Sequence, residues 1–252
     1  MTEGVQAPPD VTVCLRKLAP NLPSNIRYRL LNCLDHFDRA ECLFEVDREM
    51  ASFRAITGEE EAATCVILAM KARRYEHSER FRPWNHLDKA AVVSALIAIA
   101  PTVVPLLSEF QLVFDFSKCR IDLKIPLSNF NIDGGENVAV QPVEPLDQTF
   151  SKPYIPENEA FDAAFERLTG EEGPQSLLTL IRKAAQSRNT ILYASDTALP
   201  ESKATKESLY SRRIKAQTLL VIAVMIIQHN GHAKLISQLI VPVLKAIERA
   251  PS

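Results

Sequence analysis

The segment of residues 71–89 holds the side chains with the greatest capacity for chemistry. It contains six basic and three acidic residues, a balance of +3, together with two histidines. Guanidinium groups bind phosphate through paired N–H donors, and the free amides at the start of a helix favour the same anions. The segment therefore predicts an anion-binding site, whose ligand-binding residues are Arg73, Arg74, Arg80, Arg82 and Lys89.

His86 and Asp88 are the pair in this segment that could perform acid–base catalysis. A histidine titrates near neutral pH, and here a carboxylate lies two residues away. Such a pair acts when it is held in a cleft that shifts its pKa values. The alternative is that Asp88 belongs to a helix start and that His86 is a partly buried ring. His86 and Asp88 are therefore the candidate catalytic residues to test.

Helices on both sides of this segment must position its side chains. Thr57 and Glu60 have the spacing of a capping box, and Asn85 and Asp88 have a related spacing. Both patterns indicate a helix start. The predicted helices are residues 58–76 and 86–100, the second ending at Pro101.

A bundle of these helices would gather three histidines at one end. Another helix is expected from about residue 38, and short connections make consecutive helices antiparallel. His36, His77 and His86 would then be neighbours. A helix of eighteen residues is about 27 Å long. The acidic residues 59–61 are therefore expected at the opposite end, too far away to reach His86.

Three histidines with nearby carboxylates could bind a divalent metal. Helical two-metal sites, however, take Glu-x-x-His pairs from facing helices, and no such pair occurs at the right place. Walker, G-x-S-x-G, H-E-x-x-H and EF-hand spacings do not occur in the sequence either. The sequence therefore predicts no metal site and no cofactor.

The hydrophobic pattern predicts a mainly α chain with a small antiparallel β-sheet (α+β), a helical bundle with an inserted β-hairpin. Apolar residues keep helical spacing over most of the chain, whereas residues 110–127 alternate with period two around a polar turn. Residues 137–141 are a candidate third strand. Beyond them we expect helices at 157–168, 174–186, 206–229 and 233–250, and a strand at 190–194.

Five segments describe the expected organisation of the chain. Four prolines between residues 142 and 156 indicate a linker or a surface loop there. The helical segment after it is expected to pack with the first helices as one domain. The segments are 1–25, an irregular N-terminal arm; 26–109, helical hairpins; 110–141, the β-hairpin or small sheet; 142–156, the Pro-rich linker or loop; and 157–252, the second helical segment.

Composition limits the class of protein and its compartment. The chain has 252 residues, of which 46% are hydrophobic and 24% are charged. Five cysteines without a CxxC pair indicate free thiols, which suit a reducing compartment, so we expect a cytoplasmic protein. Residues 90–107 carry no charge, but Pro101 and Pro105 interrupt them. They are read as a buried helix, so no membrane partner is expected.

Three functions are compatible with these features. The first is a soluble intracellular interaction or regulatory protein that binds a partner protein or an anionic ligand through the basic turn at 71–89. The second is an enzyme acting on a phosphate-bearing or nucleotide-like substrate. The third is a helical protein with an apolar ligand in a cavity lined by residues 90–107 and 216–228. Nucleic acid is a less favoured partner, because the basic segment 195–213 has Tyr210 as its one interleaved aromatic residue and no groove-reading helix pattern. The sequence fixes neither the ligand nor the oligomeric state.

Overall fold

The structure is a computed structural model, which describes the part of the chain whose residues are given at the end of this paragraph. The predicted helices at 157–168 and 174–186 and the strand at 190–194 lie almost entirely outside the described residues. The described residues are 10–107, 109–126, 139–147 and 202–248, with the single residues 161, 165, 181, 182, 184, 185 and 191.

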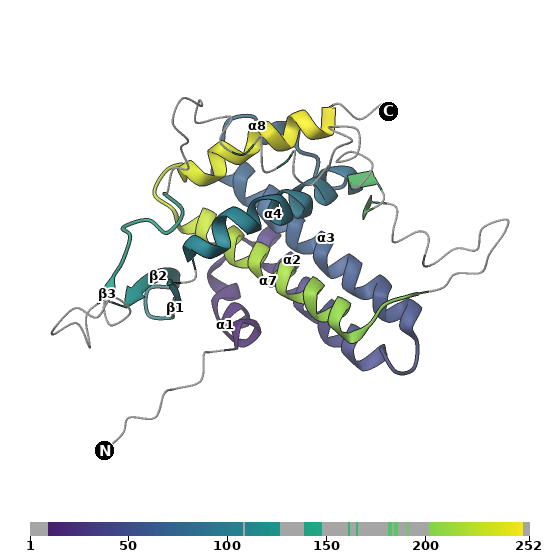
Figure 1. Ribbon diagram of the computed structural model, residues 1–252. Helices are drawn as coiled ribbons and strands as arrows, with labels where there is room; N and C mark the ends of the chain where they lie inside the picture. Colours follow the sequence, from purple (N-terminus) through teal and green to yellow (C-terminus); the bar gives the residue numbers. More distant parts are fainter. Residues whose placement is uncertain are drawn as a thin grey trace, which may run out of the picture.

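The described part confirms a mainly helical chain with a small antiparallel sheet. Six α-helices, two short 3₁₀ helices and three strands occur in it. Figure 1 shows α3 in the middle of the molecule, α2 and α7 running beside it, and the hairpin of β1 and β2 at one side. The elements are α1 Val11–Leu18, η1 Ala19–Asn21, α2 Ser24–Leu43, α3 Arg48–Ala72, η2 Ser78–Arg80, α4 His86–Leu107, β1 Gln111–Asp115, β2 Arg120–Pro126, β3 Ala139–Val140, α7 Lys206–Gln228 and α8 Lys234–Glu248.

The first two long helices are longer than predicted, and the chain turns at a different place. The expected start near residue 38 lies inside α2, and the expected start after Thr57 lies inside α3. Asp47 is the true cap, because its side chain accepts a hydrogen bond from the Met50 amide at 2.8 Å. The Thr57 hydroxyl donates instead to the Phe53 carbonyl within the helix, at 2.8 Å. The capping-box prediction for Thr57 was therefore wrong.

Gly58 allows α2 and α3 to pack closely. A Cβ atom at this position would lie 2.8 Å from Cε2 of Phe37 and 3.3 Å from the Cys33 carbonyl oxygen. Alanines at 51, 55, 62, 63 and 69 on α3 are fully buried, so the helix presents small side chains to its neighbours. Gly58, the expected first residue of a helix, is therefore a packing position inside α3.

The start of α4 was predicted correctly, but its end was not. The Asn85 side chain accepts a hydrogen bond from the Leu87 amide at 2.8 Å, and the helix begins at His86. It then continues through Pro101 to Leu107. Proline in a helix removes one hydrogen bond and costs about 3 kcal/mol. Val103, beyond the proline, is buried in the apolar core, and such packing offsets that cost.

The antiparallel hairpin is confirmed and is fixed to the end of α7. Residues of β1 and β2 pair in register from Gln111 with Lys124 to Asp115 with Arg120, and β3 pairs with the end of β2. The Gln228 side chain accepts from the Ile121 amide at 2.9 Å and donates to the Cys119 carbonyl at 2.7 Å. One side chain of α7 thus satisfies two backbone groups of the hairpin.

The last two helices follow the prediction closely. The Thr205 side chain caps α7, and Gly231, with a φ of 120°, reverses the chain before α8. Across the described elements, none of the helices reaches the length and hydropathy that crossing a lipid bilayer requires. The uncharged stretch of α4 is largely covered by neighbouring elements, including α3, α7 and α8.

Candidate functional site

The basic turn begins where α3 ends, and its first arginine points into the protein. Arg74 has a φ of 55°, and the Tyr75 amide donates back to the Met70 carbonyl at 3.0 Å, a common way to close a helix. The Arg73 guanidinium donates to the His229 carbonyl. The Tyr75 hydroxyl accepts from the Ala233 amide at 2.7 Å. These contacts fasten the end of α3 to the turn between α7 and α8.

The other basic residues do not converge on one anion site. Arg80 is paired with Glu248, and Arg82 Nε lies 3.6 Å from Asp88 Oδ2. Lys89 Nζ lies 3.5 Å from Glu60 Oε2. Arg74 lines a shallow surface depression of about 470 Å³, but this depression has two basic and two acidic neighbours, so its net charge is zero. Its lining residues are Lys71, Arg74, Tyr75, Glu76, His77, Ser78 and Glu79.

His86 and Asp88 engage different partners. His86 Nδ1 lies 2.9 Å from Glu60 Oε1, and the imidazole is half-buried. Asp88 is 1% exposed, and its Oδ2 accepts from the Arg82 amide at 2.7 Å. Neither side chain lines any of the three pockets described in this section and below. The structure therefore does not bring together the acid and the base that the sequence suggested.

The predicted group of three histidines is also dispersed. His36 lies in the core of α2 beside Arg54, and burial lowers its pKa, with the Arg54 and Arg39 charges lowering it further. Arg54 and Arg73 are nineteen positions apart on α3, which is about 28 Å along the helix. His36 is thus far from the basic turn. Among the described residues, no three His, Cys, Asp or Glu side chains are arranged to hold a metal ion.

Three successive glutamates on α3 each contact a different helix. Glu59 is paired with Arg212 and with Lys215 of α7, the latter at 2.9 Å. Glu60 contacts His86 and Lys89 of α4. Glu61 Oε1 lies 2.9 Å from Arg29 of α2. Successive helical residues point about 100° apart, so the three carboxylates of one helix can each contact a different neighbouring helix. The expectation that they lie out of reach of His86 was wrong, because they stand in the middle of α3.

An apolar cavity lies between α4, α7 and α8. We call this cavity the outer lobe, because a second, smaller cavity adjoins it. The volume of the outer lobe is about 380 Å³. Both segments named in the third hypothesis, residues 90–107 and 216–228, contribute to it, and so do α1, the hairpin and α8. All of its described lining residues are apolar except Gln217 and Thr218. They are Val11, Leu96, Ile99, Ala100, Val103, Val104, Leu112, Leu123, Leu146, Ile214, Gln217, Thr218, Val221, Ile222, Met225, Leu235, Ile236 and Leu239.

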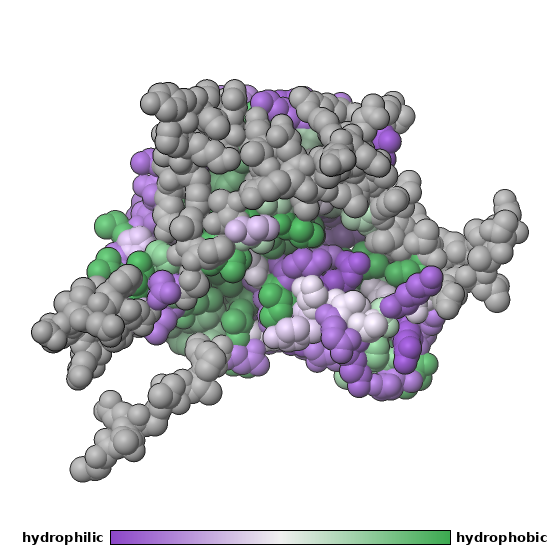
Figure 2. All heavy atoms as spheres, viewed as in Figure 1, coloured by the Kyte–Doolittle hydropathy of each residue, from purple (hydrophilic) through white to green (hydrophobic). Residues whose placement is uncertain are grey.

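The side chains that line the outer lobe are exposed at one end of the cavity and buried at the other. Val104 and Ile214 are 60% and 43% exposed, whereas Val103 and Ile236 are 7% and 5% exposed. Figure 2 shows apolar side chains gathered over α4, α7 and the hairpin on this face. Val104 and Ile214 therefore mark the mouth of the lobe, and a small apolar molecule could enter from solvent there.

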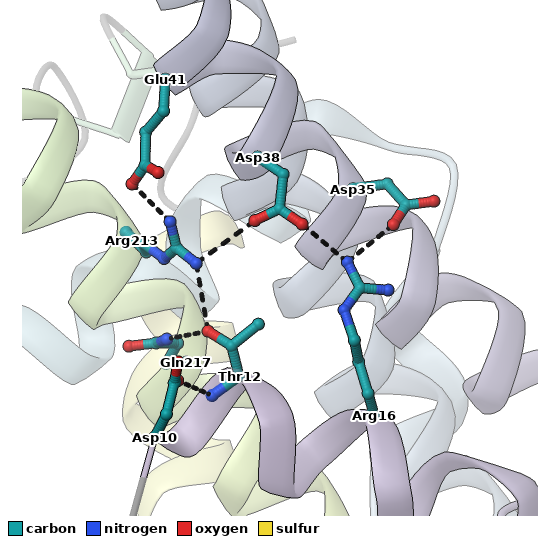
Figure 3. Close-up of polar contacts among 8 residues, drawn as sticks. All are labelled: Asp10, Thr12, Arg16, Asp35, Asp38, Glu41, Arg213 and Gln217. Carbon is teal, nitrogen blue, oxygen red and sulfur yellow. Dashed lines mark hydrogen bonds and ion pairs between the residues drawn. The ribbon is translucent and has the colours of Figure 1, made fainter.

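A polar cluster borders the mouth where α1, α2 and α7 meet (Figure 3). The Thr12 hydroxyl accepts from Gln217 at 2.8 Å and from Arg213 at 3.1 Å. Arg213 is also paired with Asp38 and Glu41. Arg16 bridges Asp35 and Asp38 at 2.8 and 2.9 Å. With Asp10, which caps α1, the cluster holds four carboxylates and two guanidinium groups, a balance of −2.

The cavity and the polar cluster form one region of the molecule, and the basic turn is a separate one. Val11 and Thr12 are adjacent on α1, and Arg213 and Ile214 are adjacent on α7. The walls formed by α1, the hairpin and α8 had no sequence signal, because contacts between distant segments leave no local pattern.

No family model, no curated protein and no solved structure matches this chain.

Proposed function

We propose that the protein binds a neutral aliphatic molecule in the outer lobe. The observation that carries the proposal is a cavity of about 380 Å³ whose described walls are almost wholly aliphatic. Small-molecule sites are typically about 300–1,000 Å³ and mostly apolar. An engineered apolar cavity of about 150 Å³ in another protein stays dry and takes up benzene. An apolar cavity favours apolar ligands, because their burial removes apolar surface from water.

The charge at the mouth favours a neutral ligand over an anionic one. The bordering polar cluster has a balance of −2, which repels a carboxylate or a phosphate. Gln217 donates its amide to Thr12, and within the described residues its side-chain oxygen accepts no hydrogen bond. That oxygen could accept a hydroxyl proton of the ligand. A long-chain alcohol, or a neutral lipid with a free hydroxyl, combines these properties.

The other two hypotheses have less support. Arg73, Arg80 and Arg82 each have a partner inside the chain, which lowers their capacity for an external anion. His86 contacts Glu60 and Asp88 accepts from the Arg82 amide, so each has a partner of its own, and an acid–base role for the pair stays a hypothesis. Binding of a partner protein at the basic turn stays a hypothesis.

Displacement of an apolar fluorescent dye tests the proposal. N-phenylnaphthylamine should brighten when it enters the outer lobe, and dodecanol should displace it and raise the melting temperature of the protein. Ala100 lines the outer lobe, so Ala100→Leu should reduce its volume and weaken dodecanol binding by about tenfold.

Two controls decide the result. Ile97 is 40% exposed on the same helix and lies outside the described cavity walls, so Ile97→Phe adds bulk without filling the lobe and should leave affinity unchanged. Dodecanoate, which has the same chain with a carboxylate, should bind more weakly than dodecanol. Absence of any displacement by dodecanol, or equal affinity in the Ala100→Leu variant, rejects the proposed function.

A further inference from the structure

A second, smaller cavity adjoins the outer lobe, and we call it the inner lobe because the side chains that line it alone are all buried. Its volume is about 60 Å³, and each of its described lining residues is apolar. Val66 and Met70 of α3 and Phe81 form walls that the outer lobe lacks. Five side chains line both lobes and therefore stand between them. They are Leu96, Ile99, Ile222, Ile236 and Leu239.

We infer that one unbranched hydrocarbon chain occupies both lobes, with its hydroxyl at Gln217 and its terminal methylene groups in the inner lobe. This inference rests on the proposed function and specifies its ligand. The direction of the chain follows from polarity, because Gln217 and Thr218 line the outer lobe and the described walls of the inner lobe have no polar side chain.

The shape of the passage selects an extended chain. The five side chains between the lobes are leucine and isoleucine, which can change rotamer to admit a narrow chain. Leu96, Ile222 and Leu239 are only partly buried, so they have room to turn. A ring system is wider than a single chain.

Affinity as a function of chain length is the direct test. Straight-chain primary alcohols from hexanol to hexadecanol are compared by dye displacement. Each methylene group that becomes buried should raise affinity about fourfold. The increase should continue beyond the length that fills the outer lobe and stop when the inner lobe is full. A branched alcohol with the same number of carbon atoms as the best straight chain should bind more weakly.

Two alanines on α4 give a matched pair of variants. Ala95 lines the inner lobe and Ala100 lines the outer lobe. Ala95→Leu should lower the affinity of the longest alcohols by about tenfold and leave hexanol unchanged. Ala100→Leu should weaken every member of the series. Ala95→Val replaces Ala95→Leu if the larger side chain lowers the melting temperature of the free protein.

The possible outcomes separate this inference from the proposed function. If alcohols bind but affinity stops rising at the same chain length in the unaltered protein and in the Ala95 variant, the ligand stays in the outer lobe. That result overturns the two-lobe inference alone. If no alcohol displaces the dye, both proposals fail. A length limit that shortens only in the Ala95 variant supports chain occupancy of the inner lobe.

Discussion

Among the described residues, Glu59 is the most deeply buried charged side chain that contacts two cations. Its side chain is 8% exposed, whereas those of Arg212 and Lys215 are 33% and 27% exposed. Removing one partner of a fully buried ion pair costs about 3–5 kcal/mol, because the remaining charge is left without compensation. Here water reaches both cations, so the expected cost is lower. Glu61, by contrast, faces Arg29, which is half exposed.

We expect Glu59→Gln to destabilise the protein by about 2 kcal/mol, because it removes the charge but keeps the shape of the side chain. Glu61→Gln, two positions away, is the matched control and should cost less than about 1 kcal/mol, because its one partner, Arg29, is half exposed. Urea denaturation of both variants measures the difference. Equal losses in the two variants would show that the two less exposed cations at Glu59 add nothing to stability.

Contacts between residues close in the sequence could be predicted, whereas contacts between distant residues could not. The Asn85 cap was predictable, because capping depends on atoms two positions apart. The contact between Glu60 and His86 was not, because it depends on how far residues 73–85 run back along α3. The sequence supplied the residue types at the basic turn but not the internal partners of Arg73 and Arg80.

At the scale of the elements, the crossing of α2 and α3 depends on one glycine. A methyl group at Gly58 would lie 2.8 Å from the Phe37 ring, which is 2% exposed and has little room to move. Alanine is the better helix former by about 1 kcal/mol, so propensity alone favours the substitution. Packing opposes it.

Gly58→Ala should lower the free energy of unfolding by about 1–3 kcal/mol, because overpacking at Phe37 outweighs the gain in helix propensity. The reason can be checked by repeating the substitution in a Phe37→Leu background, where the clash is smaller and the loss should shrink. Thermal denaturation of the four proteins gives both values. A higher melting temperature for Gly58→Ala in the unaltered background would contradict the proposed packing.

Element boundaries show where sequence patterns fail. Period-two alternation of apolar and polar residue types identified the hairpin, although burial does not alternate along its strands, since Ile121, Asp122 and Leu123 are all buried. Thr57, Gly58 and Pro101 are all common at helix ends, yet each lies inside a helix. Tertiary packing overrides such local signals when the flanking turns are buried. The helical fold class was therefore predictable, while the lengths of α2, α3 and α4 were not.

At the scale of the whole molecule, Arg213 connects three helices that are distant in the sequence. It donates to Thr12 of α1 and is paired with Asp38 and Glu41 of α2, while belonging to α7 itself. The α1 helix in turn supplies Val11 to the wall of the outer lobe. Arg213 therefore contributes both to the attachment of α1 and to holding Val11 at the wall of the cavity.

Arg213→Ala should release α1 without unfolding the centre of the molecule. Amide hydrogens of α1 should exchange at least about tenfold faster, because local opening becomes easier, whereas those of α3 should keep their protection. Hydrogen exchange followed by mass spectrometry measures both. Lys206→Ala is the control, since Lys206 pairs with Glu45 and both side chains are largely exposed. Unchanged exchange in α1 would mean that apolar packing alone holds this helix.

The directions in which the side chains of α3 point restrict where the chain can gain or lose a residue. Glu59, Glu60 and Glu61 form ion pairs with residues of α7, α4 and α2, respectively. Adding or deleting a single residue before them would turn all three carboxylates by about 100° relative to the preceding part of the helix. Every ion pair would then face the wrong neighbour. The helix can exchange side chains one at a time, but insertions and deletions are expected to be confined to its flanking turns.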